Sequence, residues 1–575
     1  MGKFLIGLVT GVLLVLLTFG LTFGLLFFAA LRFGERPPEV PNHSVLVVRL
    51  NGDIPEKAPV EIPFLNEGDA ITVTDVWKAL RNAAVDSRID AVVVEPEGLS
   101  AGWGKVEEFR SDIAQFRKSG KPVYAYLRTP QGRDYYAASG ADRIYLGPAD
   151  QFYLKGLRAE LMYFKKTLDK LGVSVDVEHA GKYKDYGDQF TRADMSPETR
   201  EVMTSLVDDL YASLTDGIAA GRHETPEQVR AAINAGPFEA AQAQKDGFVD
   251  ALGFEDEMWN ELKNRLSVRD VKKVSVATYV KTGDPAELRG GRRVALVVGE
   301  GDIVEGDPDV PAADETSLTA TGFDPLLEQV GNDSSIQAVI VRIDSPGGEV
   351  TASDEIWREM NLLSKKKPMV ISMSAVAASG GYYMAMTGDP IVAYPGTETG
   401  SIGVVFGKPN LHGLYDKLGI TKDAVERGKY AGIDSDYTSL TADEREKLRV
   451  GIDDSYKDFV TKVAAARHRK FDEIEPVSQG RVWLGSQAKE HGLVDELGGL
   501  DKAIEMVKQR ARIPAGEKVS LVVYPARRSL FDLLFRRSQP DLLESKVAAA
   551  LPGVPFRAWL HGGMLRMMPY WLMIR

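Results

Sequence analysis

The sequence contains no cysteine, and this absence excludes disulfide bonds, thiolate metal sites and a cysteine nucleophile. Basic residues are also under-represented, with 70 Lys and Arg against 82 Asp and Glu, for a formal net charge of −12. That balance argues against general nucleic-acid binding, which favours basic surfaces. Only seven histidines occur in 575 residues, and none lies between positions 349 and 409. Histidine, the usual base for a serine nucleophile, is therefore missing from residues 349–409.

Long apolar runs are scarce as well, with one exception at the N-terminus. From Phe4 to Leu31 no residue is charged, which is longer than the ~20 apolar residues that span a bilayer. A cleaved signal peptide would have a shorter apolar core and a small-residue cleavage site. We therefore predict an uncleaved transmembrane helix at 4–31, with a short flank at 1–3 and a linker at 32–43. The flanking charges encode its orientation only weakly.

The rest of the chain is an internal repeat, visible as five blocks that recur in the same order. The pairs are LNGDI at 50–54 with GEGDI at 299–303, RIDAVVV at 88–94 with SIQAVIV at 335–341, KSGKPVYAYL at 118–127 with KKKPMVISMS at 365–374, HAGKYKDYG at 179–187 with ERGKYAGID at 426–434, and AQAQKDGFVDALG at 241–253 with GSQAKEHGLVDELG at 485–498. Such self-similarity indicates two copies of one fold.

Each copy alternates short β-branched runs with longer helical patterns, which predicts an α/β fold with a mostly parallel, buried sheet. The predicted divisions are a first copy at 44–280, a linker at 281–292, a second copy at 293–512 and a basic, apolar C-terminal extension at 513–575. For the extension we consider two roles, as a packing or oligomerisation segment or as an interfacial amphipathic segment that inserts Trp559 and Trp571 into lipid.

Two features of the second copy suggest catalytic chemistry. DSPGG, with Gly347 and Gly348, follows a predicted strand and would offer backbone N–H groups to an oxyanion, although Pro-Gly-Gly is also common turn chemistry. Ser379, in SAVAASGGYYMAMTG, lies between a predicted strand and a predicted helix, where it would be either a nucleophile or an N-cap. Together they favour a nucleophile beside an oxyanion hole.

The repeat suggests a lysine as the base. Aligned with the second copy, Lys182 matches Lys429 and is common to both, whereas Lys184 matches Ala431 and Ser379 matches Gly132. Read as a strand, GKYK places Lys182 and Lys184 on one face, so only the repeat distinguishes Lys184 from Lys182 as the base. His179 is a weaker candidate for the base. A catalytic lysine must be neutral, which requires burial. One active site assembled from two complementary halves is the prediction.

These residues carry a resemblance to a known family. The chain resembles the long, two-copy form of the signal peptide peptidase A family, also called protease IV, through AGKYKDYGDQFTRADMSPE, DSPGGEVTAS, SAVAASGGYYMA and TGSIGVVFG. The resemblance implies Ser379 as nucleophile, Lys184 as general base and Ser401 as the residue that orients the lysine. It implies oxyanion donors around Gly347, Gly348 and Gly380, no metal and no cofactor, and tandem domains of the crotonase and caseinolytic-protease superfamily.

The same resemblance implies a single-pass enzyme of the bacterial inner membrane whose catalytic body faces the periplasm. Its substrates would be signal-peptide remnants and other apolar peptides, its partners membrane lipid and further copies of itself in a tetramer-like ring, with no nucleic acid. Two alternatives stay open: a crotonase-like acyl-CoA enzyme, which needs no Ser-Lys pair, and a catalytically silent membrane scaffold.

Overall fold

The computed structural model describes residues 39–59, 70–285, 288–306, 317–527, 564–568 and 573–574, together with positions 11, 15 and 18–20. Within these residues, no helix combines the length and the apolar character that a membrane crossing needs. Apart from those five positions, the predicted anchor at 4–31 lies outside the described residues, so its transmembrane role stays a prediction.

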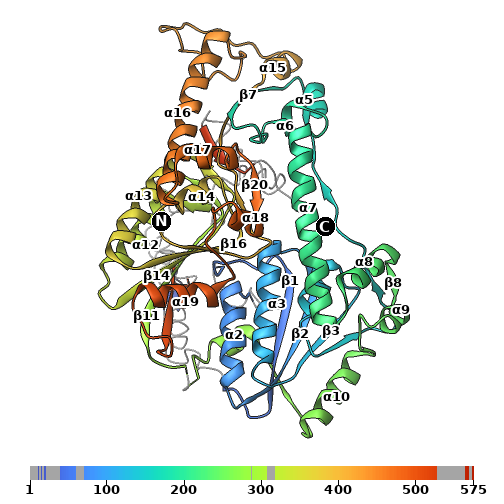
Figure 1. The fold of residues 1–575 in the computed structure, drawn as a ribbon. Helices are drawn as coiled ribbons and strands as arrows, with labels where there is room; N and C mark the ends of the chain where they lie inside the picture. Colours follow the sequence, from blue (N-terminus) through green and yellow to red (C-terminus); the bar gives the residue numbers. More distant parts are fainter. Residues whose placement is uncertain are drawn as a thin grey trace.

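The first copy is built on a parallel six-stranded sheet in the order β10-β1-β2-β3-β4-β9 (Figure 1). The strands are β1 (Ser44–Gly52), β2 (Ile89–Leu99), β3 (Val123–Leu127), β4 (Arg143–Leu146), β9 (Ala251–Leu252) and β10 (Lys272–Ser275). The main helices are α2 (Val73–Val85), α3 (Trp103–Arg117), α4 (Gly132–Ala138), α7 (Pro197–Arg222) and α10 (Glu255–Leu266). Local signals set their ends; α2, for example, begins with a capping box between Thr72 and Asp75.

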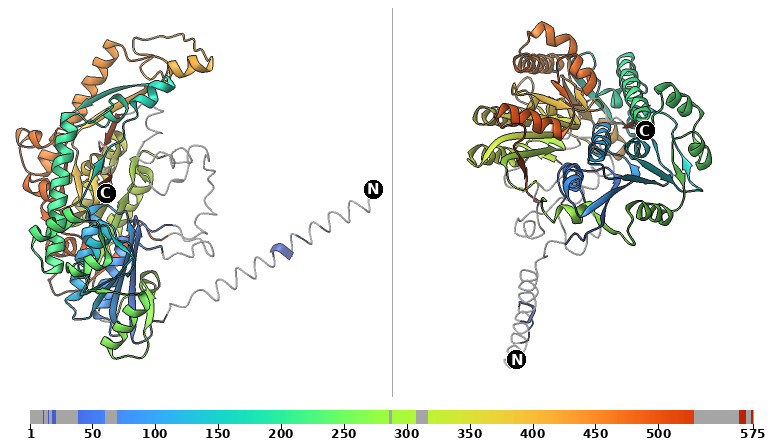
Figure 2. Two further views of the ribbon diagram at one scale, coloured as in Figure 1. Left: turned by 90° about the vertical axis from the view of Figure 1, so that its right-hand side faces the viewer. Right: turned by 60° about the horizontal axis from the view of Figure 1, so that its bottom comes forward.

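The second copy repeats this arrangement with the equivalent strand order β22-β11-β14-β16-β17-β21. Its strands are β11 (Arg292–Glu300), β14 (Ile336–Ser345), β16 (Met369–Ala378), β17 (Ile391–Ala393), β21 (Glu496–Leu497) and β22 (Val519–Tyr524). Its helices include α12 (Ala320–Asn332), α13 (Val350–Lys366), α14 (Gly380–Met384), α16 (Ala442–Ala466) and α19 (Leu500–Arg510). The shared strand order confirms that one α/β fold occurs twice, and Figure 2 (right) shows the copies side by side. Strand β22 belongs to this sheet although we placed 513–575 in the extension.

A third sheet joins the two copies and the C-terminal segment, in the order β13-β12-β15-β23-β19-β7. The first copy contributes β7 (Ser174–Ala180) and the C-terminal segment contributes β23 (Met564–Met567). The second copy contributes β12 (Asp302–Val304), β13 (Ser317–Thr319), β15 (Gly347–Glu349) and β19 (Val404–Asn410). Leu565, Met567 and Met568 are buried, so this described part of the extension packs into protein, as the first of our two alternatives predicts. Trp559 and Trp571 lie outside the described residues.

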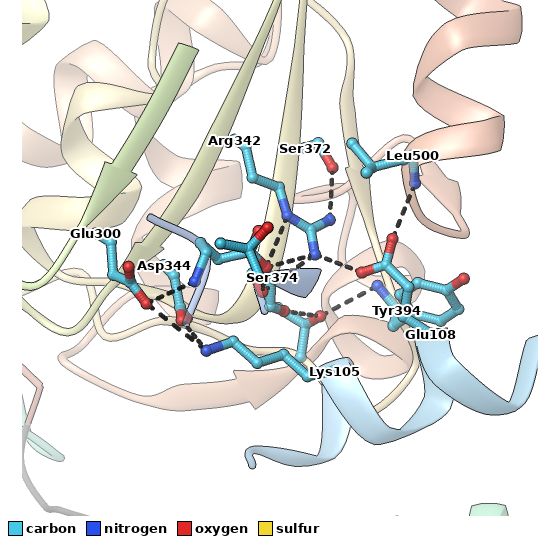
Figure 3. Close-up of polar contacts among 12 residues, drawn as sticks. Lys105, Glu108, Glu300, Arg342, Asp344, Ser372, Ser374, Tyr394 and Leu500 are labelled. Atoms are coloured by element: carbon cyan, nitrogen blue, oxygen red, sulfur yellow. Dashed lines mark hydrogen bonds and ion pairs between the residues drawn. The ribbon is translucent and has the colours of Figure 1, made fainter. Parts of the chain in front are cut away.

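The copies are also joined by a buried ionic network between β14 and the first copy (Figure 3). The guanidinium of Arg342, which is fully buried, donates to Glu56 at 2.8 Å and also to Glu108 of α3. Lys105, one turn before Glu108, forms an ion pair with Asp344 at 2.8 Å. An unpaired charge inside a protein is very costly. The buried charges of each copy are therefore neutralised by opposite charges of the other copy.

Candidate active site

Ser379 lies at the carboxyl end of β16, where the chain turns sharply into α14. Its side chain is completely buried and its backbone has φ 54° and ψ −113°, a conformation that non-glycine residues rarely adopt. The hydroxyl forms no capping bond with α14, so the N-cap alternative does not describe it. Such strain concentrates at functional sites and requires support from the surrounding structure.

Lys184 reaches Ser379 from the other copy. Its Nζ lies 2.7 Å from Ser379 Oγ, and the lysine is fully buried. Our description of GKYK as a strand was wrong, because β7 ends at Ala180 and a turn follows, in which Lys184 N–H donates to the Gly181 carbonyl at 3.1 Å. The turn places Lys184 inside while Lys182 stays exposed, so the two lysines do not share a face.

Two glycines make room for the Lys184 side chain. A Cβ atom at Gly480 would lie 2.6 Å from Lys184 Cβ, and one at Gly403 would lie 3.0 Å from Lys184 Cδ. The first distance is shorter than carbon atoms in contact allow, and the second is very tight. A larger residue at either position would therefore displace the lysine. We did not predict either glycine, because nothing in their local sequence indicates a contact with position 184.

Ser401 also contacts the Lys184 amine. Its hydroxyl and its carbonyl oxygen each lie 2.9 Å from Lys184 Nζ. The backbone at Ser401 also has positive φ, at 52°, and its N–H donates to the Arg481 carbonyl at 2.7 Å. Predicted from the resemblance as a residue near the lysine, Ser401 thus lies within hydrogen-bonding distance of it.

The environment of Lys184 favours a neutral amine. Burial lowers its pKa well below the ordinary value, Asp185 opposes this effect, and the buried Arg566 reinforces it. Within the described residues, no carboxylate lies at ion-pair distance from Nζ. A neutral amine has two N–H donors, which suit the two Ser401 oxygens, and one lone pair, which can accept the Ser379 O–H.

Two of the three predicted oxyanion glycines, Gly347 and Gly380, lie against each other, and Gly348 follows Gly347 in β15. A Cβ atom at Gly347 would lie 2.6 Å from the Gly380 nitrogen, and Gly347 and Gly348 both have positive φ, at 102° and 159°. The Gly347 N–H donates to Ser345 Oγ at 3.2 Å, which leaves Gly348 and Gly380 as the candidate donors. Gly347 itself allows the close approach of the chains.

Two other candidate residues lie elsewhere. His179 is exposed on β7, and its ring Nδ1 contacts the Gly181 carbonyl at 3.1 Å. Lys182 stacks over the Tyr183 ring at 4.8 Å, and its amine lies 3.9 Å from Glu201. Neither has a contact with Ser379 among the described residues, so the geometry brings together Ser379, Lys184 and Ser401 alone of the titratable and nucleophilic candidates.

Comparison with known proteins gives a family match in both copies. A model of "Peptidase family S49" matches residues 115–269, which include Lys184, and residues 361–514, which include Ser379 and Ser401. The chain is 36% identical over 487 residues to the chloroplastic serine protease SPPA of Arabidopsis thaliana, covering 83% of this chain and 71% of that protein. It is 30% identical over 509 residues to Protease 4 of Salmonella typhi, covering 83% of this chain and 77% of the relative.

Among solved structures, ClpP1 from Listeria monocytogenes aligns with a TM-score of 0.22 and 16% identity, covering 36% of this chain and 91% of that one.

Proposed function

Because this chain belongs to peptidase family S49 and is a serine peptidase, we propose that it cleaves peptide bonds with a Ser-Lys dyad in which Ser379 is the nucleophile and Lys184 the general base. The 2.7 Å contact between Lys184 Nζ and Ser379 Oγ carries this proposal. Neither an acyl-CoA enzyme nor a silent scaffold would require two residues 195 positions apart to meet in a buried, strained site.

The proposed reaction begins with neutral Lys184 accepting the Ser379 proton while Oγ attacks the peptide carbonyl carbon. Backbone N–H groups of Gly348 and Gly380 stabilise the oxyanion. The protonated lysine then donates its proton to the leaving amine, which leaves an ester on Ser379. Water, activated by the same lysine, hydrolyses the ester and restores the free serine.

Ser401 acts as a positioning residue in this scheme. Two of its oxygens accept the lysine N–H groups, which directs the nitrogen lone pair at Ser379. Among the described residues no carboxylate lies at ion-pair distance from the amine, and the effect of burial on its pKa outweighs that of Asp185, so the lysine returns readily to its neutral form after each proton transfer.

The substrates we propose are cleaved signal peptides and other apolar peptides at a membrane, with the catalytic body on the periplasmic side of the bacterial inner membrane. The uncharged N-terminal stretch and the motif resemblance support this setting. A ring-like homo-oligomer and contact with lipid remain predictions on the same basis.

The test uses the full chain in detergent with a fluorogenic peptide, comparing Ser379→Ala and Lys184→Met with the wild type. Lys182→Ala is the matched control, since it removes a neighbouring lysine that is exposed. We expect kcat/KM to fall by at least about 10³-fold in both dyad variants and to be unchanged in the control. Activity retained by either dyad variant would refute the dyad.

A further inference from the structure

Strand β16 has a bulge shortly before the proposed nucleophile, Ser379. Two backbone pairs of β14 with β16 flank the bulge, Ile343 with Met373 and Ser345 with Ala377. Between these pairs, residues 374–376 of β16 lie opposite the single residue Asp344 of β14. Such bulges are common beside active sites, where they change the direction of a side chain. The bulge therefore sets the direction in which β16 leads to Ser379.

The side chain of Asp344 spans the bulge between the two strands. One of its carboxylate oxygens accepts the Val376 N–H at 3.0 Å, and the other lies 2.8 Å from Lys105 Nζ. Asp344 lies three residues before Gly347, and Val376 lies three residues before Ser379. One carboxylate therefore joins the strand end that leads to the oxyanion glycines to the strand end that carries the proposed nucleophile.

Helix α3 of the first copy brings Lys105 to this carboxylate, and Figure 3 shows the two side chains together. A Cβ atom at Gly102 would lie 2.5 Å from Ala375 Cβ, and one at Gly104 would lie 2.6 Å from the Ser374 carbonyl oxygen. Real Cβ atoms do not approach other atoms so closely. The two glycines therefore allow the first turn of α3 to lie directly on the bulge.

The internal repeat shows that this arrangement has a direction. In the alignment of the two copies, Lys105 matches Ala352 and Asp344 matches the exposed Glu97. Because Ala352 carries no charge, the second copy cannot offer the first copy an equivalent cation. The ion pair thus follows the same division as the dyad: the lysine belongs to the first copy, and its partner belongs to the copy that contains Ser379.

Lys105 keeps the Asp344 carboxylate in place against repulsion. The two side chains are only 2% and 11% exposed, and oxygens of Asp53 and Glu300 also lie 3.6 and 3.8 Å from the same amine. Without the amine, three carboxylates would face one another with little water between them. Asp344 would then turn away or bind a proton, and either change weakens its hydrogen bond with the Val376 N–H.

We propose that Lys105 is a positioning residue of the active site, which acts through Asp344 to fix the bulge and so to set the place of Ser379 relative to the oxyanion donor Gly348. The inference rests on the proposed dyad. Lys105 itself touches neither the substrate nor the reacting atoms. The spacing matters most when the oxyanion forms, so loss of this lysine slows the reaction without weakening peptide binding.

The experiment compares Lys105→Met with the wild type, as full chains in detergent with the fluorogenic peptide. Rates are expressed per reactive serine, counted by labelling to completion with a fluorophosphonate, so that unfolded protein does not contribute. We expect kcat to fall about 10- to 100-fold, with KM and the midpoint of the pH–rate profile unchanged. Lys121→Met is the matched control and should keep the wild-type kcat, because its amine donates to the Ala83 and Asp86 carbonyls of the first copy.

Two double variants separate positioning from stability. Lys105→Met/Asp344→Asn removes one charge of each sign and keeps an amide oxygen that can accept the Val376 N–H, so it should recover most of the lost kcat. Lys105→Met/Asp344→Ala has the same net charge without the acceptor, and we expect its kcat to be at least about tenfold lower than that of the Asn variant. This pair remains informative even where Lys105→Met is too unstable to assay.

Three results would overturn the proposal. A wild-type kcat per reactive serine in Lys105→Met would make the lysine a purely structural contact between the copies. Equal kcat values in the two double variants would exclude the route through Asp344. A shifted pH midpoint in Lys105→Met would mean that its charge acts on Lys184 instead. Hydrolysis that survives Ser379→Ala is a different outcome, since it would refute the proposed function itself.

Discussion

Two lysines of the first copy are buried against the second copy, and their surroundings differ. Lys105, which is 2% exposed, has carboxylate oxygens of Asp344, Asp53 and Glu300 at 2.8, 3.6 and 3.8 Å (Figure 3). Lys184, fully buried, has the oxygens of two serines. Burial lowers the pKa of Lys105, but the neighbouring carboxylates, first Asp344 and then Asp53, raise it by more than burial lowers it. The pKa of Lys105 therefore ends above its ordinary value. Burial leaves the pKa of Lys184 well below it.

The difference shows that burial alone does not make a lysine a base. Burial lowers the pKa in both places, and the number of carboxylates decides whether the amine stays charged. Lys105 is therefore a fixed cation that joins the copies. It also holds Asp344, whose other oxygen accepts the Val376 N–H at 3.0 Å on the nucleophile strand. Burial instead favours the neutral form of Lys184.

The largest effect should come from giving Lys184 the surroundings of Lys105. Ser401→Asp places a carboxylate where a hydroxyl now lies 2.9 Å from Nζ, which would keep the lysine protonated. We expect kcat/KM to fall by about 10³-fold or more at neutral pH, although serine and lysine are both present. Steady-state kinetics at several pH values would check this.

Ser401→Ala is the matched control for that substitution. It removes one acceptor without adding charge, so we expect a loss of only about 10- to 100-fold. Equal activity in the Asp and Ala variants would show that charge on Lys184 does not control the reaction.

The second-largest effect should come from removing the charge of Lys105, and it concerns stability. Lys105→Met leaves Asp344, Asp53 and Glu300 facing one another without their cation, and breaking a buried ion pair costs about 3–5 kcal/mol. Chemical denaturation should show that loss in the free energy of unfolding. Lys121→Met is a suitable control, because Lys121 Nζ donates only to the backbone carbonyls of Ala83 and Asp86 among the described residues.

Much of this architecture is predictable from the sequence. The repeat predicted two α/β copies, and the contrast of Lys184 with Ala431 and of Ser379 with Gly132 selected the two residues that meet. The turn at 181–184 was misread because a short alternating segment has the same pattern as a strand. Gly403, Gly480, Arg342 and the tail strand were missed because their partners lie far away in the sequence, so no local period records the contacts.

The pH dependence of activity is the third test of the comparison. The proposed reaction needs neutral Lys184, so kcat/KM should rise as pH rises through the lysine's pKa and level off above it. Because burial lowers that pKa well below its usual value of 10.5, the midpoint should lie far below 10.5. A pH–rate profile would measure it. A rising limb centred near 10.5 would contradict a desolvated base.

The smallest effect concerns stability. The unfolded chain protonates this lysine below pH 10.5, whereas the folded chain holds it neutral down to its lowered pKa. The folded state thus binds fewer protons, so it loses stability as pH falls between these two values and gains it as pH rises. Lys184→Met removes that cost while keeping an unbranched apolar chain, so its Tm should exceed that of the wild type by a few degrees at neutral pH, and the gap should narrow toward pH 10.5. Thermal unfolding of both proteins across that range gives the answer. A lower Tm in Lys184→Met at neutral pH would mean that the amine's three contacts outweigh its desolvation, and that Lys184 resembles Lys105 after all.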